Sequence, residues 1–286
     1  MPPYNPEPPA SQDGSTAPAD GDDLAQLEAR VRQDLELIDH PHMAWLEPQP
    51  APNGGTALDV LIVGAGQSGL ATAFGLMRSK VDNILVVDKA PCGQEGPWRT
   101  YARMPTLRSP KDYTGPDLDI PSLTYRAWHT ATYGERSWQQ LDLIPSTHWA
   151  DYLLWVRRMT AVPVRNQTEV VDIGPAGALL EVRLRQADGV ERSVWVRKVV
   201  LATGQDGAGL WWMPSAVAAL PIEMRAHAAD DIDFDALKGK SVAVLGAGAS
   251  AFDNAAVALE AGARKVTLFS RRAKVQGIQP YRWLTF

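Results

Sequence analysis

The chain has 286 residues, of which 45% are hydrophobic and 21% are charged, and it carries a formal net charge of −5 at pH 7. This length suffices for two domains with substantial cores, and the acidic balance, without a basic stripe, argues against a nucleic-acid partner. The single cysteine, Cys92, excludes an intramolecular disulfide framework, a cysteine-rich metal site and a redox-active Cys-x-x-Cys pair, so we expect no metal.

The N-terminal region divides into a tail and a helix. Residues 1–22 are rich in proline and contain neither the basic nor the apolar stretch of a signal peptide, which predicts a disordered tail. Apolar residues at helical spacing predict a helix over Asp23–Ile38, and a linker continues to residue 57. The chain contains no run of 18 or more apolar residues. We therefore expect no membrane partner and a cytoplasmic protein.

Residues 58–90 have the pattern of a strand, a glycine-rich turn, a helix and a second strand. In this pattern the first glycine allows a tight turn, the second lets a pyrophosphate approach the helix, and the third lets helix and strand pack closely. An acid just past the second strand, here Asp88, suits the hydroxyls of an unphosphorylated ribose. The segment therefore predicts a site for FAD or NAD. The candidate residues are Gly64, Gly66, Gln67, Ser68, Gly69, Asp88 and Lys89.

The middle of the chain predicts three kinds of structure. Residues 92–140 contain many Pro, Gly and Trp residues and little periodicity, which indicates a long irregular excursion of the functional kind. Residues 146–160 predict a helix capped by Ser146 or Thr147. Short strands are predicted after it, at residues 170–173, 178–185, 193–196 and 198–202.

Residues 240–272 repeat the strand, glycine turn, helix and strand of the first motif. Ser270 stands where the first copy has Asp88, and two arginines follow it. A serine and arginines at this place suit a ribose 2′-phosphate, so the second copy predicts an NADP site. The candidate residues are Gly246, Gly248, Ala249, Ser250, Ala251, Arg271 and Arg272.

Taken together, these motifs resemble the two-dinucleotide flavoproteins, and within them the class B flavin-dependent monooxygenases, over residues 58–279. The two glycine motifs look like the FAD and NADPH fingerprints of that group. Gly96-Pro97-Trp98 is similar to its Gly-Gly-x-Trp segment, with Glu95 in place of one glycine, and Thr203-Gly204 to its Ala-Thr-Gly segment. The resemblance implies that Gly96, Trp98, Thr203 and Gly204 also contact FAD.

The implied fold is α/β, with two Rossmann-like dinucleotide-binding domains, for FAD and NADPH, of the three-layer ββα/βαβ type. We expect the FAD-binding domain over residues 58–204 and the NADPH-binding domain over residues 205–286. In the family the chain returns after the NADPH domain to complete the FAD domain. Here the sequence stops 14 residues beyond Arg272, which predicts a truncated, incomplete second domain.

The activity implied by the resemblance is oxygenation of a small substrate. NADPH would reduce FAD, the reduced flavin would bind O2 as a C4a-hydroperoxyflavin, and one oxygen would pass to a nitrogen, sulfur or carbonyl centre. Two alternatives stay open: an NADPH-dependent flavin oxidase or reductase without oxygen insertion, and an inactive nucleotide-binding fragment. The sequence identifies neither a catalytic residue nor an oligomeric state.

One subgroup of the family is disfavoured. Baeyer–Villiger monooxygenases carry Phe-x-Gly-x-x-x-His-x-x-x-Trp before the second glycine motif. Here only His227 fits, because Pro221, Glu223 and Asp231 occupy the other three positions. His227 is a cofactor-side group or a loop histidine on this evidence.

Other polar residues of the tryptophan-rich part have simple structural explanations. His129, His148, Asp142 and Asp151 are more typical of core packing or solvated loops than of catalysis. We expect the segment from residue 98 to residue 138 to cover the flavin. It contains Arg103, Arg108, Lys111 and Trp128.

Overall fold

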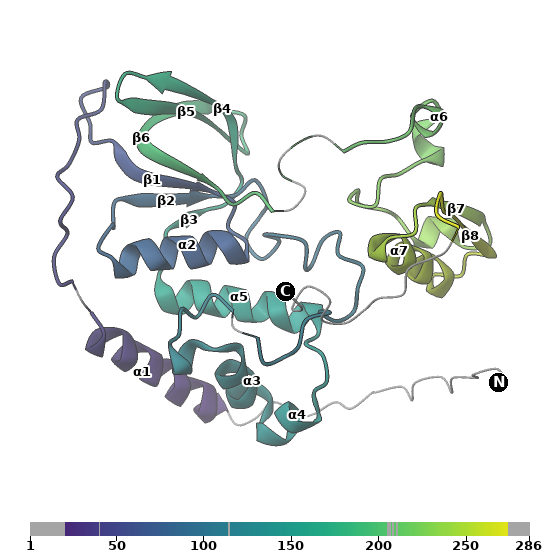
Figure 1. Ribbon diagram of the computed structural model, residues 1–286, viewed down its shortest axis with the longest axis horizontal. Coiled ribbons are helices and arrows are strands. Elements are labelled where there is room, and N and C mark those ends of the chain that lie inside the picture. The colour runs from purple at the N-terminus through teal and green to yellow at the C-terminus, as the bar shows by residue number, and fades with distance from the viewer. Residues whose placement is uncertain are drawn as a thin grey trace.

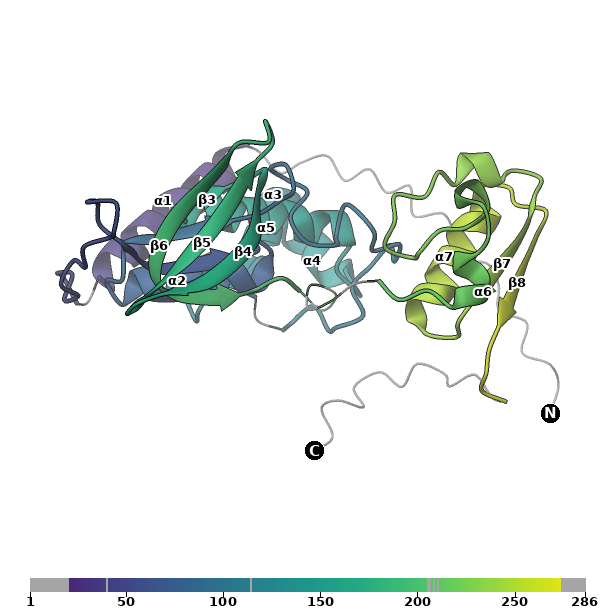
Figure 2. The same ribbon diagram turned by 90° about the horizontal axis from the view of Figure 1, so that it is seen from above.

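A computed structural model describes residues 21–39, 41–113, 115–204, 207, 209 and 211–273. Most of the predicted disordered tail, residues 1–20, lies outside the described residues, as does the segment after residue 273. The last two residues of that tail are helical, since α1 spans Gly21–Leu37. The elements form two units, seen at opposite ends of the long axis in Figures 1 and 2. The first unit runs from α1 to β6, and the second from α6 to β8.

The first unit is built on a six-stranded sheet of order β3-β2-β1-β6-β5-β4. Strands β1, β2, β3 and β6 are parallel, whereas β5 is antiparallel to both of its neighbours. The parallel strands bring their carboxyl ends to one edge, where ligands of open α/β sheets bind. The strands are β1 (Leu58–Val63), β2 (Ile84–Val87), β3 (Val164–Arg165), β4 (Thr168–Ala176), β5 (Leu179–Gln186) and β6 (Glu191–Leu201).

Strand β6 corrects one prediction, because the two strands expected at 193–196 and 198–202 are a single strand. Its first half pairs with β5, and its second half pairs with β1. The charged Arg197 interrupts the apolar pattern without ending the strand, since its Nε lies 3.0 Å from Oδ1 of Asp59 on β1. This ion pair compensates the negative charge of the Asp59 side chain, which is 9% exposed.

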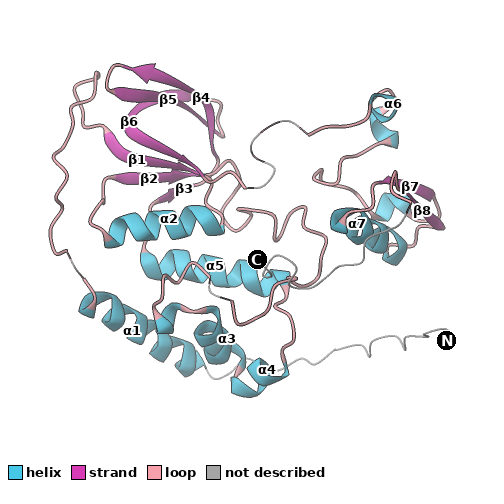
Figure 3. Cartoon of the chain, viewed as in Figure 1, coloured by secondary structure: helices cyan, strands magenta, loops and turns pink. Residues whose placement is uncertain are grey.

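Helices cover one side of the parallel strands β1, β2 and β3, and the β4–β5 hairpin, which continues the same sheet, lies on the other side (Figures 1 and 3). Helices α2 (Gln67–Arg78) and α5 (Ser146–Thr160) lie nearest the sheet, and α1 and α3 (Tyr125–Tyr133) lie beyond them. The prediction of a helix over residues 146–160 is confirmed, but its cap is wrong. Pro145 is the N-cap, and Ser146 Oγ instead donates to the carbonyl oxygen of Met104, 3.0 Å away.

The segment predicted to be irregular, residues 92–140, is helical in its last part. It contains η1 (Pro121–Leu123), α3 and α4 (Glu135–Gln140). Thr124 caps α3 by accepting a hydrogen bond from Ala127 N at 3.2 Å, and Gly134, with φ of 85°, separates α3 from α4. The helices are short, so their apolar period is too brief to stand out from the surrounding proline and glycine residues.

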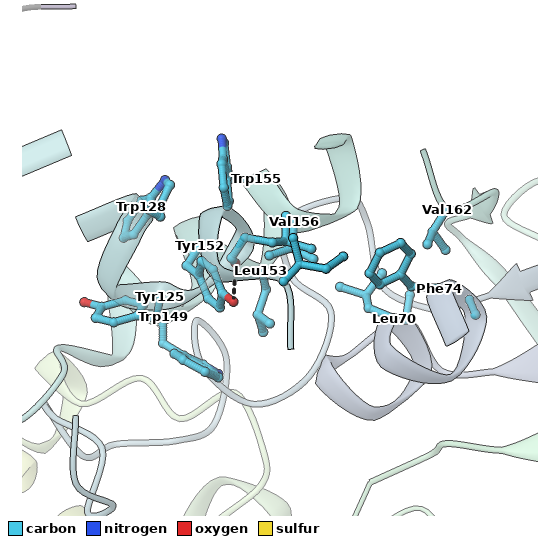
Figure 4. Packing of buried hydrophobic residues seen from close by; sticks show 14 of the residues in the cluster. Leu70, Phe74, Tyr125, Trp128, Trp149, Tyr152, Leu153, Trp155, Val156 and Val162 are labelled. Atoms are coloured by element: carbon cyan, nitrogen blue, oxygen red, sulfur yellow. Dashed lines mark hydrogen bonds between the residues drawn. The ribbon is translucent and has the colours of Figure 1, made fainter. Parts of the chain in front are cut away.

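Buried aromatic side chains hold these helices together (Figure 4). Tyr125 and Tyr152 meet edge to face, with ring centroids 5.3 Å apart, and Trp149 packs on Tyr152 at 5.1 Å. Tyr152 Oη donates to Leu123 O at 2.9 Å, so its buried hydroxyl is satisfied. Aromatic pairs of this geometry stabilise beyond the area they bury. The core therefore fixes α5 against α3.

His129 lies inside this aromatic core and is 1% exposed. Its Nε2 lies 3.1 Å from Ser137 Oγ, and its Nδ1 lies 3.3 Å from Tyr125 Oη. Burial, with smaller contributions from His148 and Lys111, lowers the pKa of His129 from 6.5 to about 4. The histidine is therefore neutral in the folded protein at neutral pH.

This histidine predicts acid sensitivity of the fold. In the unfolded chain His129 binds a proton below about pH 6.5, whereas in the folded protein its pKa is about 4. Between these two pH values only the unfolded state gains the proton, so the free energy of unfolding falls as the pH falls. The expected loss is on the order of 3 kcal/mol. Urea denaturation of His129→Gln between pH 7 and pH 4.5 should show a shallower decline than the wild type. Burial also lowers the pKa of His148, so part of the decline remains.

The matched control is His42→Gln, since the His42 side chain is 78% exposed. This variant should keep the wild-type decline. An unchanged slope in His129→Gln would show that the buried histidine does not govern acid stability.

The second unit contains a strand, a glycine turn, a helix and a strand, as predicted. These are β7 (Ser241–Leu245), α7 (Ala249–Glu260) and β8 (Lys265–Phe269), preceded by α6 (Ser215–Ala218), η2 (Ile222–Met224) and η3 (Asp235–Leu237). Within the described residues its sheet has two parallel strands, and Leu245 and Phe269 are each 57% exposed. The predicted α/β fold with two Rossmann-like units is confirmed. None of the described helices combines the length and apolar character needed to cross a bilayer.

Candidate nucleotide-binding sites

The three glycines of the first motif have different structural environments. A methyl group at Gly64, where φ is 106°, would overlap the carbonyl oxygen of Ala202 at the end of β6. One at Gly69 would overlap the carbonyl oxygen of Gly64. A methyl group at Gly66 would have no protein atom closer than the Cα of Gly96, at 3.9 Å. Two glycines thus serve packing, and Gly66 faces open space.

This open space lies at the N-terminus of α2. Gly66 is the N-cap and offers no side chain to the first N–H groups of the helix, which have no intrahelical acceptor. Gln67 is half-buried, and Ser68 is exposed. Unpaired N–H groups and the positive end of the helix dipole favour an anion such as a pyrophosphate. The geometry fits the predicted cofactor.

Asp88 lies beside this turn and fixes it. Its Oδ2 accepts a hydrogen bond from Ala65 N and its Oδ1 accepts one from Ala90 N, each at 2.8 Å. A carboxylate oxygen can accept further bonds, so Asp88 is able to receive ribose hydroxyls as well. Lys89, the next residue, is exposed. The sequence did not indicate this second, structural role of Asp88.

Two further predicted segments meet the same edge. Gly96, with φ of 72°, lies against Gly66, and Trp98 follows it. Thr203 and Gly204 follow β6 after the single residue Ala202, and both are exposed. Because β6 pairs with β1 in parallel, the residues after β6 lie beside the first glycine turn, which follows β1. The structure therefore brings together all the predicted residues of the first site.

Glu95, which replaces a glycine of the family pattern, has a structural explanation. Its side chain is 7% exposed, and its Oε1 accepts from Arg157 Nη1 at 2.8 Å and from Asn166 Nδ2 at 2.6 Å. Its Oε2 accepts from Gly93 N at 2.7 Å. These bonds tie the Gly96–Trp98 segment to α5 and to the loop before β4. The sequence does not reveal this network, since Arg157 and Asn166 are 62 and 71 residues away from Glu95.

A cavity of about 260 Å³ lies beside the first glycine motif. The excursion predicted to cover the flavin supplies most of its wall. The sequence does not link Tyr113 or Trp149 to this site, and the helical spacing of Trp149 predicts a core residue. The lining residues are Gln67, Trp98, Met104, Leu107, Arg108, Ser109, Pro110, Tyr113, Ile144 and Trp149.

The second glycine motif has a looser turn than the first. Gly246 has φ of 141°, and Ala251 fits where the first copy requires glycine, with its Cβ 3.6 Å from a methyl group placed on Gly246. Gly248 has no neighbouring atom within 4 Å of such a methyl group. Ala249 and Ser250, at the start of α7, are exposed. Open space at a helix N-terminus is again suited to a pyrophosphate.

The end of β8 supplies the positive charge of this second site. Gly246 N donates to Phe269 O at 2.9 Å, which places the residues after β8 beside the glycine turn. Ser270 Oγ accepts from Arg272 N at 3.1 Å, and both Arg271 and Arg272 are exposed. The second copy thus has a neutral serine where the first has the Asp88 carboxylate, and two guanidinium groups follow that serine.

Two of the remaining polar residues have structural partners. His227 stacks on Trp211, with ring centroids 4.8 Å apart, and its Nδ1 accepts from Ala229 N. Asp151 pairs with Arg99 on the surface. In the part of the chain that the structure describes, no group of three or more His, Cys, Asp or Glu residues is placed to hold a metal ion.

Both units have the strand, glycine turn and helix that are typical of dinucleotide-binding proteins. The chain belongs to the pyridine nucleotide-disulphide oxidoreductase family, whose model matches residues 61–285. The FAD-dependent urate hydroxylase of Xanthomonas campestris pv. campestris is 48% identical over 260 residues, which are 91% of this chain and 54% of that protein. The chain thus spans about half the length of this relative.

Several solved structures share the fold. The desferrioxamine pathway cadaverine monooxygenase of Erwinia amylovora has a TM-score of 0.63 at 18% identity, covering 79% of this chain and 54% of that one. The bacillithiol disulfide reductase of Bacillus cereus has a TM-score of 0.58 at 20% identity, covering 80% and 63%. The flavin-containing monooxygenase of Stenotrophomonas maltophilia has a TM-score of 0.56 at 23% identity, covering 77% and 59%.

Proposed function

We propose that this protein is an FAD-dependent, NADPH-using monooxygenase that hydroxylates urate or a closely similar oxopurine. The observation that carries the proposal is the 48% identity to the FAD-dependent urate hydroxylase over 91% of this chain. The open cradle at Gly66, backed by the α2 N-terminus and Asp88, supports FAD as the resident cofactor. In this proposal residues 58–204 bind the flavin, residues 205–286 bind the nicotinamide cofactor, and the protein is cytoplasmic.

In this proposal the chain positions its cofactors and substrate. The N–H groups of Gln67 and Ser68 bind the FAD pyrophosphate, and Asp88 binds the adenosine ribose. Gly96, Trp98, Thr203 and Gly204 border the flavin. When bound, FAD supplies the acceptor for hydride from NADPH and the centre that activates O2. The apolar wall of the neighbouring cavity, including Met104 and Leu107, excludes water from that centre.

The nicotinamide cofactor is held by the second unit. Gly248, Ala249, Ser250 and Ala251 receive the pyrophosphate at the start of α7. Arg271 and Arg272 receive the 2′-phosphate that distinguishes NADPH from NADH.

The test is turnover by the purified protein. We expect the purified protein to be yellow and its flavin to be reduced by NADPH. Addition of urate should raise O2 consumption, with one O2 consumed for each urate consumed. Stoichiometric H2O2 release without urate consumption would identify an oxidase or reductase instead. A colourless protein that takes up no added FAD would identify a nucleotide-binding protein without turnover.

Cofactor preference tests the second site separately. Replacing Arg271 and Arg272 with alanine should raise the Kd for NADPH about 10- to 100-fold, since a charge-assisted phosphate contact contributes about 1.5–3 kcal/mol. The Kd for NADH should change less than twofold. Titration calorimetry measures both.

The matched control is Arg192→Ala, an exposed arginine on β6 of the first unit. It should leave both constants unchanged. Equal losses for NADPH and NADH in the double variant would refute the 2′-phosphate assignment.

A further inference from the structure

The cavity beside the first glycine motif is lined by hydrogen-bond donors and aromatic rings. Its described lining includes the Arg108 guanidinium, the Gln67 amide and the Ser109 hydroxyl, but no carboxylate. Trp149 is 4% exposed, and its buried indole Nε1 has no hydrogen-bond partner among the described residues. A buried N–H without an acceptor costs free energy, so the packing around Trp149 is not fully satisfied. The lining thus suits an electron-rich ring that presents acceptors.

Arg108 is the one charged residue in this lining, and its charge is shared with the second unit. Its Nη2 donates to both carboxylate oxygens of Asp253, at 2.7 and 2.6 Å. Asp253 lies on α7, two residues after the last small residue of the second glycine motif. The Nε and Nη1 groups of Arg108 make no hydrogen bond within the described residues. The guanidinium can therefore donate to a second acceptor in the cavity.

The ion pair is placed so that a ligand can change its strength. The side chains of Arg108 and Asp253 are 38% and 20% exposed, so neither is sealed from the cavity mouth. An anion that joins the guanidinium brings a second negative charge close to Asp253. The anion and the Asp253 carboxylate repel each other because both are negative. This repulsion weakens the contact of Arg108 with one of them.

We propose that Arg108 is a specificity-determining residue that recognises the negative charge of a planar, carbonyl-bearing heterocycle in this cavity, and that Asp253 competes with that anion for the guanidinium. The inference rests on the proposed function, because urate carries one negative charge at neutral pH and presents carbonyl oxygens around a flat ring. The aromatic side chains of Trp98, Tyr113 and Trp149 border the ring. Because Asp253 belongs to α7, substrate binding also loosens the contact between the two units.

The test compares a charged ligand with a neutral ligand of the same skeleton. Binding of urate and of 1,3,7,9-tetramethylurate is measured by titration calorimetry on the full chain, for wild type and each variant. Arg108→Gln should weaken urate binding about 10- to 100-fold and leave the neutral analogue within twofold. Arg108→Lys, which keeps the charge but loses the planar fork, should show an intermediate loss.

Asp253→Asn is expected to have the opposite effect on urate binding. Asparagine keeps an acceptor oxygen for Arg108 but removes the competing charge, so urate binding should tighten about three- to tenfold. If the pair merely held the units together, Arg108→Gln and Asp253→Asn would both weaken binding, and the proposal would be overturned. The matched control is Arg183→Gln, which breaks an Arg–Asp pair on β4 and β5, with Nη2 of Arg183 3.1 Å from Oδ2 of Asp172. This variant should leave the binding of both ligands unchanged.

Three further outcomes are decisive. A yellow wild-type protein that does not bind urate overturns this inference and leaves the flavin assignment standing. A colourless protein that binds urate with the expected Arg108 dependence supports the inference while the proposed function fails. A lowered flavin reduction potential in Arg108→Gln, with urate binding intact, assigns the arginine to the anionic reduced flavin and overturns the proposal.

Discussion

Gly69→Ala is expected to lower the melting temperature by about 5–10 °C, corresponding to a loss of roughly 2–4 kcal/mol in the free energy of unfolding. The added methyl group would overlap the carbonyl oxygen of Gly64, which belongs to the turn between β1 and α2. Relief requires α2 to move away from the sheet, and Leu70, Ala73 and Phe74 on its buried face would lose core contacts. Differential scanning calorimetry measures the change.

The control for this substitution is Gly174→Ala on β4. Gly174 has no atom within 4 Å of an added methyl group, so the melting temperature should stay within about 1–2 °C of wild type. A Gly69→Ala protein as stable as the Gly174→Ala protein would contradict the close packing of helix and strand.

Gly66→Ala is expected to leave stability nearly unchanged and to abolish flavin retention. Its methyl group would meet no protein atom closer than 3.9 Å, so the turn tolerates it. The same methyl group would occupy the space through which a pyrophosphate reaches the N-terminus of α2. We expect at least a 100-fold rise in the Kd for FAD, equivalent to about 2.7 kcal/mol. Absorbance of the purified protein and FAD titration measure the effect.

The two substitutions separate the structural glycine from the ligand-facing glycine. Gly66→Ala should match the wild-type melting temperature of the protein without flavin, whereas Gly69→Ala should not. A Gly66→Ala protein that stays yellow through purification would show that FAD does not approach this turn.

Much of the candidate site could be predicted because its signals are local. The spacing of Gly64, Gly66 and Gly69 reflects the geometry of one turn and one helix, and needs no distant partner. The contrast between Asp88 and Ser270 is also local, since each residue follows a strand directly. The helix over residues 146–160 was predicted to the residue because its apolar period runs for four turns without proline or glycine.

The missed features depend on contacts between distant residues. In the sequence, Arg197 predicts a break between two strands. In the structure it forms an ion pair with Asp59 of β1, and the strand continues through it. Glu95 reads as a departure from a family pattern until Arg157 and Asn166 enclose it. The short helix α3 packs Tyr125 on Trp149 and Tyr152 of α5, and α4 packs Trp138 on Tyr125 of α3. The sequences of α3 and α4 do not reveal these contacts.

The sequence by itself determined that the chain has two dinucleotide-binding motifs and that their charges differ. Turn geometry and the charge of a residue after a strand are properties of a few neighbouring positions, so no tertiary information is needed to read them. Only the tertiary structure decided which residues surround the cavity and that Arg108 meets Asp253, 145 residues away. Such contacts depend on how β6 and the aromatic core direct the chain through space, and the periodicity of a short segment carries no record of them.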